Sequence, residues 1–159
     1  MTISEELRQD LENVLSGAAW YGTPIYTIID EVSFETAYEK PPGSVHNIAN
    51  IVLHMLSWTE EVMDRMNGMN AQRPSSGDWP HPGDPDEEKW QTYVSDLKLV
   101  NVNLLKVIQD FPEEQWNEPI NYDREGQAVA TYKQTVVGFI QHQVYHTGQI
   151  ALLKRIING

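Results

Sequence analysis

Apolar side chains recur every three or four residues through four long stretches of the chain, which is the spacing of one face of an α-helix. These stretches cover residues 2–15, 44–66, 85–109 and 131–157, and a shorter one covers 24–32. Most of the glycines and prolines fall between the stretches, where helix is not expected. The pattern therefore predicts an all-α protein built as a bundle of four long helices.

Residues with capping side chains mark where each predicted helix begins. The expected N-caps are Thr2, Thr23, Ser44 or Asn47, Asp84 and Thr131. Thr2 and Thr131 are each followed three residues later by Glu or Gln, which is the spacing of a capping box. Pro24 and Pro85 suit the first helical position, because their missing N–H has no partner there. Gly68 is expected to end the second long helix in the left-handed conformation.

Two connections between the long helices are expected to lack regular structure. Residues 67–84 contain three prolines and three glycines, and so long a loop is uncommon inside a compact domain. We expect it to lie over one end of the bundle, where Trp79 can bury its ring. Residues 112–116 are predicted to form a single helical turn and 119–126 a connection, with a β-hairpin across 121–130 as the alternative.

Length and cysteine content bound the class of protein. The chain has 159 residues, close to the usual size of one domain, so a single domain over residues 1–159 is expected. It has no cysteine, which excludes disulfides, thiolate metal sites and a cysteine nucleophile. The N-terminus is acidic rather than basic and apolar, unlike a secretory signal. These features predict a cytoplasmic protein.

The strongly acidic balance limits the partners. Eleven Lys and Arg residues against 23 Asp and Glu residues give a formal charge of −12. Such a field repels phosphates, so neither nucleic acid nor an anionic membrane surface is expected as a partner. No apolar run approaches the roughly 18 residues that a membrane span requires. A small molecule remains as the expected partner.

Two of the five histidines share a face of the last predicted helix. His142 and His146 are four residues apart, which places both rings within reach of one ion. A helical wheel turns them toward the apolar face, where each ring nitrogen needs a partner. Gln143 stands where a zincin would have Glu, which disfavours a metalloprotease. The alternative is a pair of core histidines held by ordinary hydrogen bonds.

A third ligand is expected from the helix over residues 44–66. His54 lies at the edge of its apolar stripe and can face inward. His54, His142 and His146 are therefore predicted to form a metal site. His46 and His81 are expected to be surface or capping residues, because one lies at a helix entrance and the other in the proline-rich loop.

Side chains near the predicted ligands are candidates to accept hydrogen bonds from the histidine rings or to line a substrate pocket. Histidine ligands usually donate their second ring N–H to an oxygen. The candidate acceptors are Gln149, Glu61 and Asp64. Tyr145, Trp58 and Trp79 are candidates to line a substrate pocket, with core packing as the alternative for each. No carboxylate stands out as a general base, so no catalytic residue is assigned.

Several motifs together resemble the DinB-like (DinB/YfiT-like) family, over nearly the whole chain. They are Trp20-Tyr21-Gly22-x-Pro24, the segments 44–48 and 52–58, Asp78-Trp79-Pro80 and the segment 141–150. The family's signature is a histidine shortly before a tryptophan in the second helix, and a His-x-x-x-His that ends in Gly-Gln-Ile. Position by position, the family's metal ligands fall on His54, His142 and His146.

The resemblance implies a four-helix bundle with one long crossover connection, a divalent metal at one end of the bundle and a homodimer. Some relatives are metal-dependent transferases, and one is an isomerase, that use low-molecular-weight thiols. The charge of this chain argues against DNA binding, although the family's name refers to DNA damage.

Three neutral imidazoles suit zinc or nickel first, with iron or copper as alternatives, and leave a coordination position open. Since the chain has no cysteine, any thiol must arrive as a cosubstrate. We therefore expect a metal-dependent transferase that activates a low-molecular-weight thiol. The alternatives are a metal-dependent hydrolase that uses water, and a non-catalytic, dimeric, stress-related metal-binding bundle.

Overall fold

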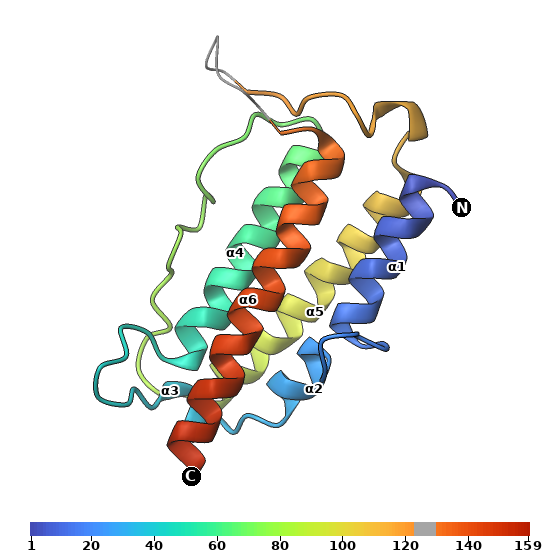
Figure 1. The fold of residues 1–159 in the computed structure, drawn as a ribbon. Coiled ribbons are helices and arrows are strands. Elements are labelled where there is room, and N and C mark those ends of the chain that lie inside the picture. The colour runs from blue at the N-terminus through green and yellow to red at the C-terminus, as the bar shows by residue number, and fades with distance from the viewer. Residues whose placement is uncertain (123–129) are drawn as a thin grey trace.

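Four long helices form the molecule in the computed structural model, which describes residues 1–122 and 130–159 (Figure 1). They are α1 (Ile3–Leu15), α4 (Ile48–Met66), α5 (Glu87–Asp110) and α6 (Tyr132–Asn158). The shorter elements are α2 (Ile25–Asp30), α3 (Phe34–Tyr38) and the 3-10 turn η1 (Glu113–Gln115). The predicted all-α bundle is confirmed, and the described residues contain no β-strand.

Each long helix packs against two others. Both α4 and α1 contact α5 and α6, so that α4 and α1 lie at opposite corners of the bundle. Figure 1 shows α4 and α5 running in one direction and α1 and α6 in the other. The connection from α4 to α5 must therefore return along the length of the bundle, as the single long crossover that the family resemblance implies.

The crossover does not lie over one end of the bundle, and that prediction was wrong. Figure 1 shows it running beside α4 for most of the helix length. Because α5 begins at the end where α4 began, the 20 or so intervening residues must span the long axis rather than fold back locally. This route brings the crossover alongside the middle of α4.

Capping explains where most helices begin. The side chains of Thr2 and Thr131 both form the predicted capping boxes. Asn47 caps α4 in the same way, whereas Ser44 instead donates to the carbonyl of His46.

Two predicted helix starts were wrong. Helix α2 is capped by Pro24 without any side-chain hydrogen bond, so Thr23 is not its cap. Helix α5 begins two residues later than predicted. Asp86, not Asp84, accepts the hydrogen bond from the backbone N–H of Lys89, at 2.9 Å. Asp86 takes the role because it directly precedes the first residue of α5, where its side chain reaches the free N–H groups of the first turn.

Gly68 ends α4 as predicted. Its φ is +88°, and the N–H groups of Gly68 and Met69 donate to the carbonyls of Arg65 and Asp64. This is the paired hydrogen bonding of a Schellman motif.

The short helix α3 was missed by the sequence reading. The Ser33 hydroxyl accepts from the N–H of Thr36 and so caps the helix, but five residues are too few to show a clear apolar period. The predicted turn at 112–116 is confirmed by η1. Pro119 and Thr131 form an isolated β-bridge. The alternative hairpin across 121–130 falls largely on residues 123–129, which lie outside the described residues.

The core runs along the bundle axis and holds the helices in place. Leu11, Met55, Leu104 and Ile150, one from each long helix, are fully buried. Burying each side chain of this size contributes roughly 1.5–3 kcal/mol. Within the described part of the chain, no helix is both long and apolar enough to cross a membrane.

Candidate metal centre

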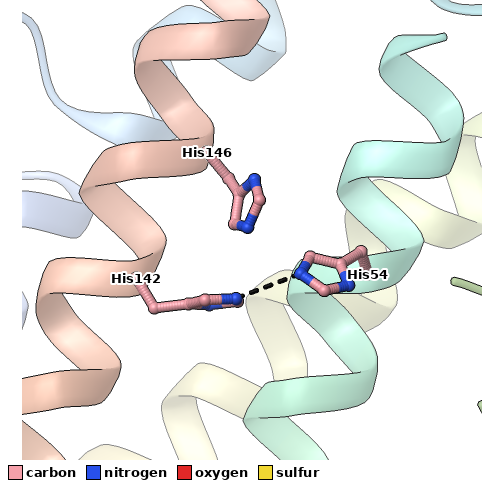
Figure 2. Close-up of side chains that lie close together, drawn as sticks. All are labelled: His54, His142 and His146. Carbon is pink, nitrogen blue, oxygen red and sulfur yellow. Dashed lines mark hydrogen bonds between the residues drawn. The ribbon is translucent and has the colours of Figure 1, made fainter. Parts of the chain in front are cut away.

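Three histidines from two helices meet between α4 and α6. His54 lies in the first half of α4, and His142 and His146 lie one turn apart near the middle of α6. Figure 2 shows the three rings pointing toward a common space between the two helices. One ring nitrogen from each lies within 4.8 Å of the others. The structure thus brings together all three residues that the sequence singled out, but away from the end of the bundle.

Each ring has an oxygen beside its Nδ1 atom. The acceptors are the Asp78 carbonyl for His54 (2.5 Å), the Gln143 side chain for His142 (3.1 Å) and the Gln149 side chain for His146 (2.7 Å). These oxygens only accept, so each Nδ1 carries the proton of a neutral imidazole. The Nε2 atom of each ring is then left with a bare lone pair.

The predicted acceptor Gln149 is confirmed, whereas Glu61 and Asp64 were wrong. The carboxylate of Glu61 is buried against Arg65 and also accepts from the backbone N–H of Gln72 at 3.0 Å. Neither carboxylate hydrogen-bonds to a histidine. The sequence reading also missed Gln143, whose amide donates onward to the Thr59 hydroxyl at 3.3 Å. Only the inward-facing position of Gln143 on the predicted helix could have indicated this role from the sequence.

The spacing of the bare nitrogens suits a metal ion. The Nε2 atoms of His54 and His142 are 3.0 Å apart. Two lone pairs facing each other at that distance repel, unless a cation lies between them. In a tetrahedral site with metal–nitrogen bonds of 2.0–2.1 Å, two ligand nitrogens are about 3.3 Å apart. The donor set and its geometry therefore fit a divalent transition metal.

Burial keeps these imidazoles neutral. Removal from water lowers the pKa of His54 and of His142, and it lowers the pKa of His146 to about 4. The neighbouring imidazoles contribute to this lowering of the pKa of His146, because a second positive charge close by is unfavourable. Near pH 7 the rings are therefore in the form that binds metal rather than the protonated form.

Asp78 ties the crossover to the site. Beyond its carbonyl, its carboxylate Oδ1 lies 3.3 Å from Nδ1 of His54 and accepts from the indole N–H of Trp58 at 2.7 Å. The Trp58 hydrogen bond holds the pKa of Asp78 below its ordinary value, with His54 and Arg73 adding to the effect. Asp78 is thus an anion beside the His54 ring. Only the Asp-Trp-Pro motif in the crossover signalled it.

Trp79 closes one side of the cluster. Its indole is stacked between the rings of His46 and His54, with centroids 3.8 Å and 3.7 Å away. His46 therefore lies beyond Trp79 and outside the cluster, as expected of a non-ligand. His81 is exposed, and its Nδ1 accepts from the N–H of Gly83 at 3.0 Å. Both histidines have structural rather than metal-binding surroundings.

The two other aromatic candidates, Trp58 and Tyr145, lie in different surroundings. Trp58 lines a cavity of about 390 Å³ that also borders His54 and His142. Tyr145 is 65% exposed, with its ring edge-on to His146 at 5.0 Å. Core packing, the alternative considered for Tyr145, was therefore wrong.

A helical bundle with a single crossover and a buried three-histidine cluster between two of its helices is the architecture that the sequence motifs led us to expect. The model of the DinB superfamily matches residues 25–150, a range that includes α4, the crossover and all three histidines. The chain belongs to the DinB superfamily. Comparison with curated proteins gave no match.

Proposed function

We propose that His54, His142 and His146 bind a divalent transition metal, and that the protein is a metal-dependent transferase whose nucleophile is a low-molecular-weight thiol. The observation that carries the metal site is the convergence of three Nε2 lone pairs whose Nδ1 protons are all donated elsewhere. Among the described residues no group donates to these three lone pairs, and a cation would supply the missing partner.

The donor set points to zinc or nickel, with iron or copper as alternatives. Neutral imidazole nitrogens suit these metals better than magnesium or calcium, which prefer oxygen. Three neutral ligands leave the double charge of the ion unreduced and a further position open. When bound, such an ion lowers the pKa of a coordinated thiol or water toward neutrality.

The chain's own residues would prepare the site for this chemistry. The three Nδ1 hydrogen bonds orient the ligand rings, and Asp78 places a negative charge behind His54. Trp79 excludes water from one face of that ring. In the transfer, a bond forms between the thiol sulfur and the electrophilic carbon. The leaving group departs with its electron pair, and the thiol proton passes to solvent.

Thiol use is supported by the resemblance of the motifs to thiol-dependent members of the family. Since the chain has no cysteine, the thiol would be a cosubstrate. A hydrolase that activates water would use the same ligands. A non-catalytic protein that only binds metal would need no space for a substrate beside the ion. The cavity beside His54 and His142 therefore favours an enzyme.

The metal site is tested by elemental analysis of protein purified without a histidine tag. We expect about one metal ion per chain in the wild type and in the control His81→Ala. His54→Ala, His142→Ala and His146→Ala should each lose most of the metal. Full metal content in all three variants would overturn the site.

The reaction is tested with the metal-loaded protein and a chromogenic aromatic halide, with and without added thiols. Turnover that needs both metal and thiol is the expected result. Turnover without thiol would indicate the hydrolase, and none with several thiols would favour the binding protein.

A further inference from the structure

The cavity beside the histidine cluster carries little free charge, although the protein as a whole is strongly acidic. It lies between α4 and α6 and has a volume of about 390 Å³. That is within the range of roughly 300–1,000 Å³ typical of sites for small organic ligands. His54 and His142 form one part of its wall, so a molecule bound there lies against two of the three histidines.

Among the residues that the structure describes, the wall contains two charged side chains, Arg65 and Asp78, and each already has partners. The Arg65 guanidinium is paired with Glu61, donates to the Gln72 carbonyl at 3.1 Å and lies over the Trp58 ring. The Asp78 carboxylate accepts from Trp58 and lies 3.5 Å from the guanidinium of Arg73. The two wall charges are opposite in sign and individually compensated. The described side chains of the wall therefore offer no unpaired counter-charge to a charged ligand, which would lose its own hydration on binding.

The polar side chains on the α6 side of the wall are also engaged. The Gln134 side chain accepts from the N–H of Thr131 at 3.0 Å, as part of the cap of α6. The Thr135 hydroxyl donates to the Thr131 carbonyl at 2.9 Å. The Gln134 oxygen and the Thr135 hydroxyl proton are therefore committed to the start of the helix, and of these two side chains the Gln134 amide N–H group can still donate to a ligand.

The other described residues of the wall are apolar. Val62 and the Trp58 ring contribute from α4, and Phe139 from α6. Gly138 leaves additional space, because a Cβ atom built there would meet no atom within 4 Å. The cavity is thus an apolar recess with the nitrogen cluster at its side.

We infer that this cavity binds an uncharged, predominantly apolar organic molecule, which serves as the electrophilic substrate. Its role as electrophile rests on the proposed function, whereas binding of an apolar molecule does not. Contact with the apolar wall would provide the affinity, and the position beside His54 and His142 would place the reactive carbon near the metal-bound nucleophile.

The inference is tested by titrating the full-length, metal-loaded protein with N-phenyl-1-naphthylamine, a neutral probe that becomes fluorescent in apolar surroundings. We expect saturable binding. The sulfonated anion 1-anilinonaphthalene-8-sulfonate has similar aromatic rings and should bind at least tenfold more weakly to the same protein after removal of the metal by a chelator, because a bound ion would itself attract the anion. Equal or tighter binding of the anion would overturn the inferred ligand class.

The location is tested by filling the cavity from Gly138. Gly138→Leu should weaken binding of the neutral probe at least tenfold, and Gly138→Ala should have an intermediate effect. Gly148→Leu is the matched control, because Gly148 lies on the same helix, has equally open space at its Cβ position and does not border the cavity. It should bind the probe like the wild type. Unchanged binding in Gly138→Leu, or equal losses in both leucine variants, would overturn the site.

Circular dichroism verifies the fold of each variant, and Gly138→Val replaces the leucine variant if that one does not fold. Metal content is measured on the same samples, which keeps the two proposals separate. If a Gly138 variant loses probe binding but keeps its metal, the loss is due to the filled cavity and not to damage to the metal site. If the wild type binds no metal yet binds the neutral probe, the proposed function fails and the apolar site remains.

Discussion

The indole of Trp79 lies flat against the imidazole of His54, with ring centroids 3.7 Å apart and planes within 7° of parallel. The two residues are brought together by the crossover, which also supplies the Asp78 carbonyl to Nδ1 of the same imidazole. One ring of the cluster is therefore oriented by a segment outside the two helices that carry the histidines.

Removal of the Trp79 ring should weaken the metal site. In Trp79→Ala, water gains access to His54 and the ring loses its stacking partners, so we expect faster release of metal to a chelator. Trp79→Phe keeps an aromatic plane and should show a smaller effect. Trp20→Ala is the control, because Trp20 is fully exposed. Equal release rates in Trp79→Ala and Trp20→Ala would contradict a shielding role.

Loss of the Gln149 side chain should lower metal affinity without unfolding the protein. Its oxygen accepts from Nδ1 of His146 at 2.7 Å, and loss of such a hydrogen bond typically costs 10–100-fold in affinity. We expect a change of that size in Gln149→Leu, measured by competition with a chelator. Gln149→Glu retains an acceptor and should bind at least as tightly as the wild type. Gln141→Leu, at an exposed position on α6, is the control.

Glu113 should make stability depend on pH through α1. Its carboxylate accepts from the backbone N–H groups of Ile3 at 2.7 Å and Ser4 at 3.4 Å. The Ile3 hydrogen bond is the largest cause that lowers the pKa of Glu113 from its ordinary value of 4.5. A lowered carboxyl pKa means that the stabilisation is present above pH 4.5 and is lost as the pH falls through the folded-state value.

Thermal unfolding of Glu113→Gln across a pH series tests this. At pH 7 the variant should unfold at a lower temperature than the wild type, and the gap should close at acid pH. Glu114→Gln, an exposed neighbour, should match the wild type throughout. A gap that stays constant down to pH 3 would rule out the charge as the cause.

The same substitution should have opposite effects at two glycines. Gly68→Ala forces a side chain into the left-handed conformation at φ +88°, at a cost of about 1–2 kcal/mol. Its Cβ would meet only the Asn121 side chain at an ordinary 3.8 Å, so the cost is conformational. Gly148→Ala, in the middle of α6, should stabilise by up to about 1 kcal/mol. Urea unfolding measures both changes in stability. A loss of stability in Gly148→Ala would show that the space at the Cβ position of residue 148 is not open.

The sequence by itself determined the long helices and one side of the site. Helices are closed by hydrogen bonds between residues four apart, so apolar period and capping residues such as Thr2 and Thr131 report them locally. The same geometry places His142 and His146 on one face and Gln149 within reach of His146, where the structure confirms it among the three candidate acceptors. These relationships hold wherever α6 packs.

Only the tertiary structure decided which groups lie opposite the face of α6 that carries His142 and His146. That α4 and α6 are neighbours, with His54 level with His142, depends on how four apolar stripes are buried together, and no local spacing encodes it. Asp78 and Trp79 reach His54 because the crossover must travel the length of the bundle. Glu61, a predicted acceptor for a histidine, instead forms an ion pair with Arg65 and accepts from the N–H of Gln72. Such competition among buried partners is settled by packing.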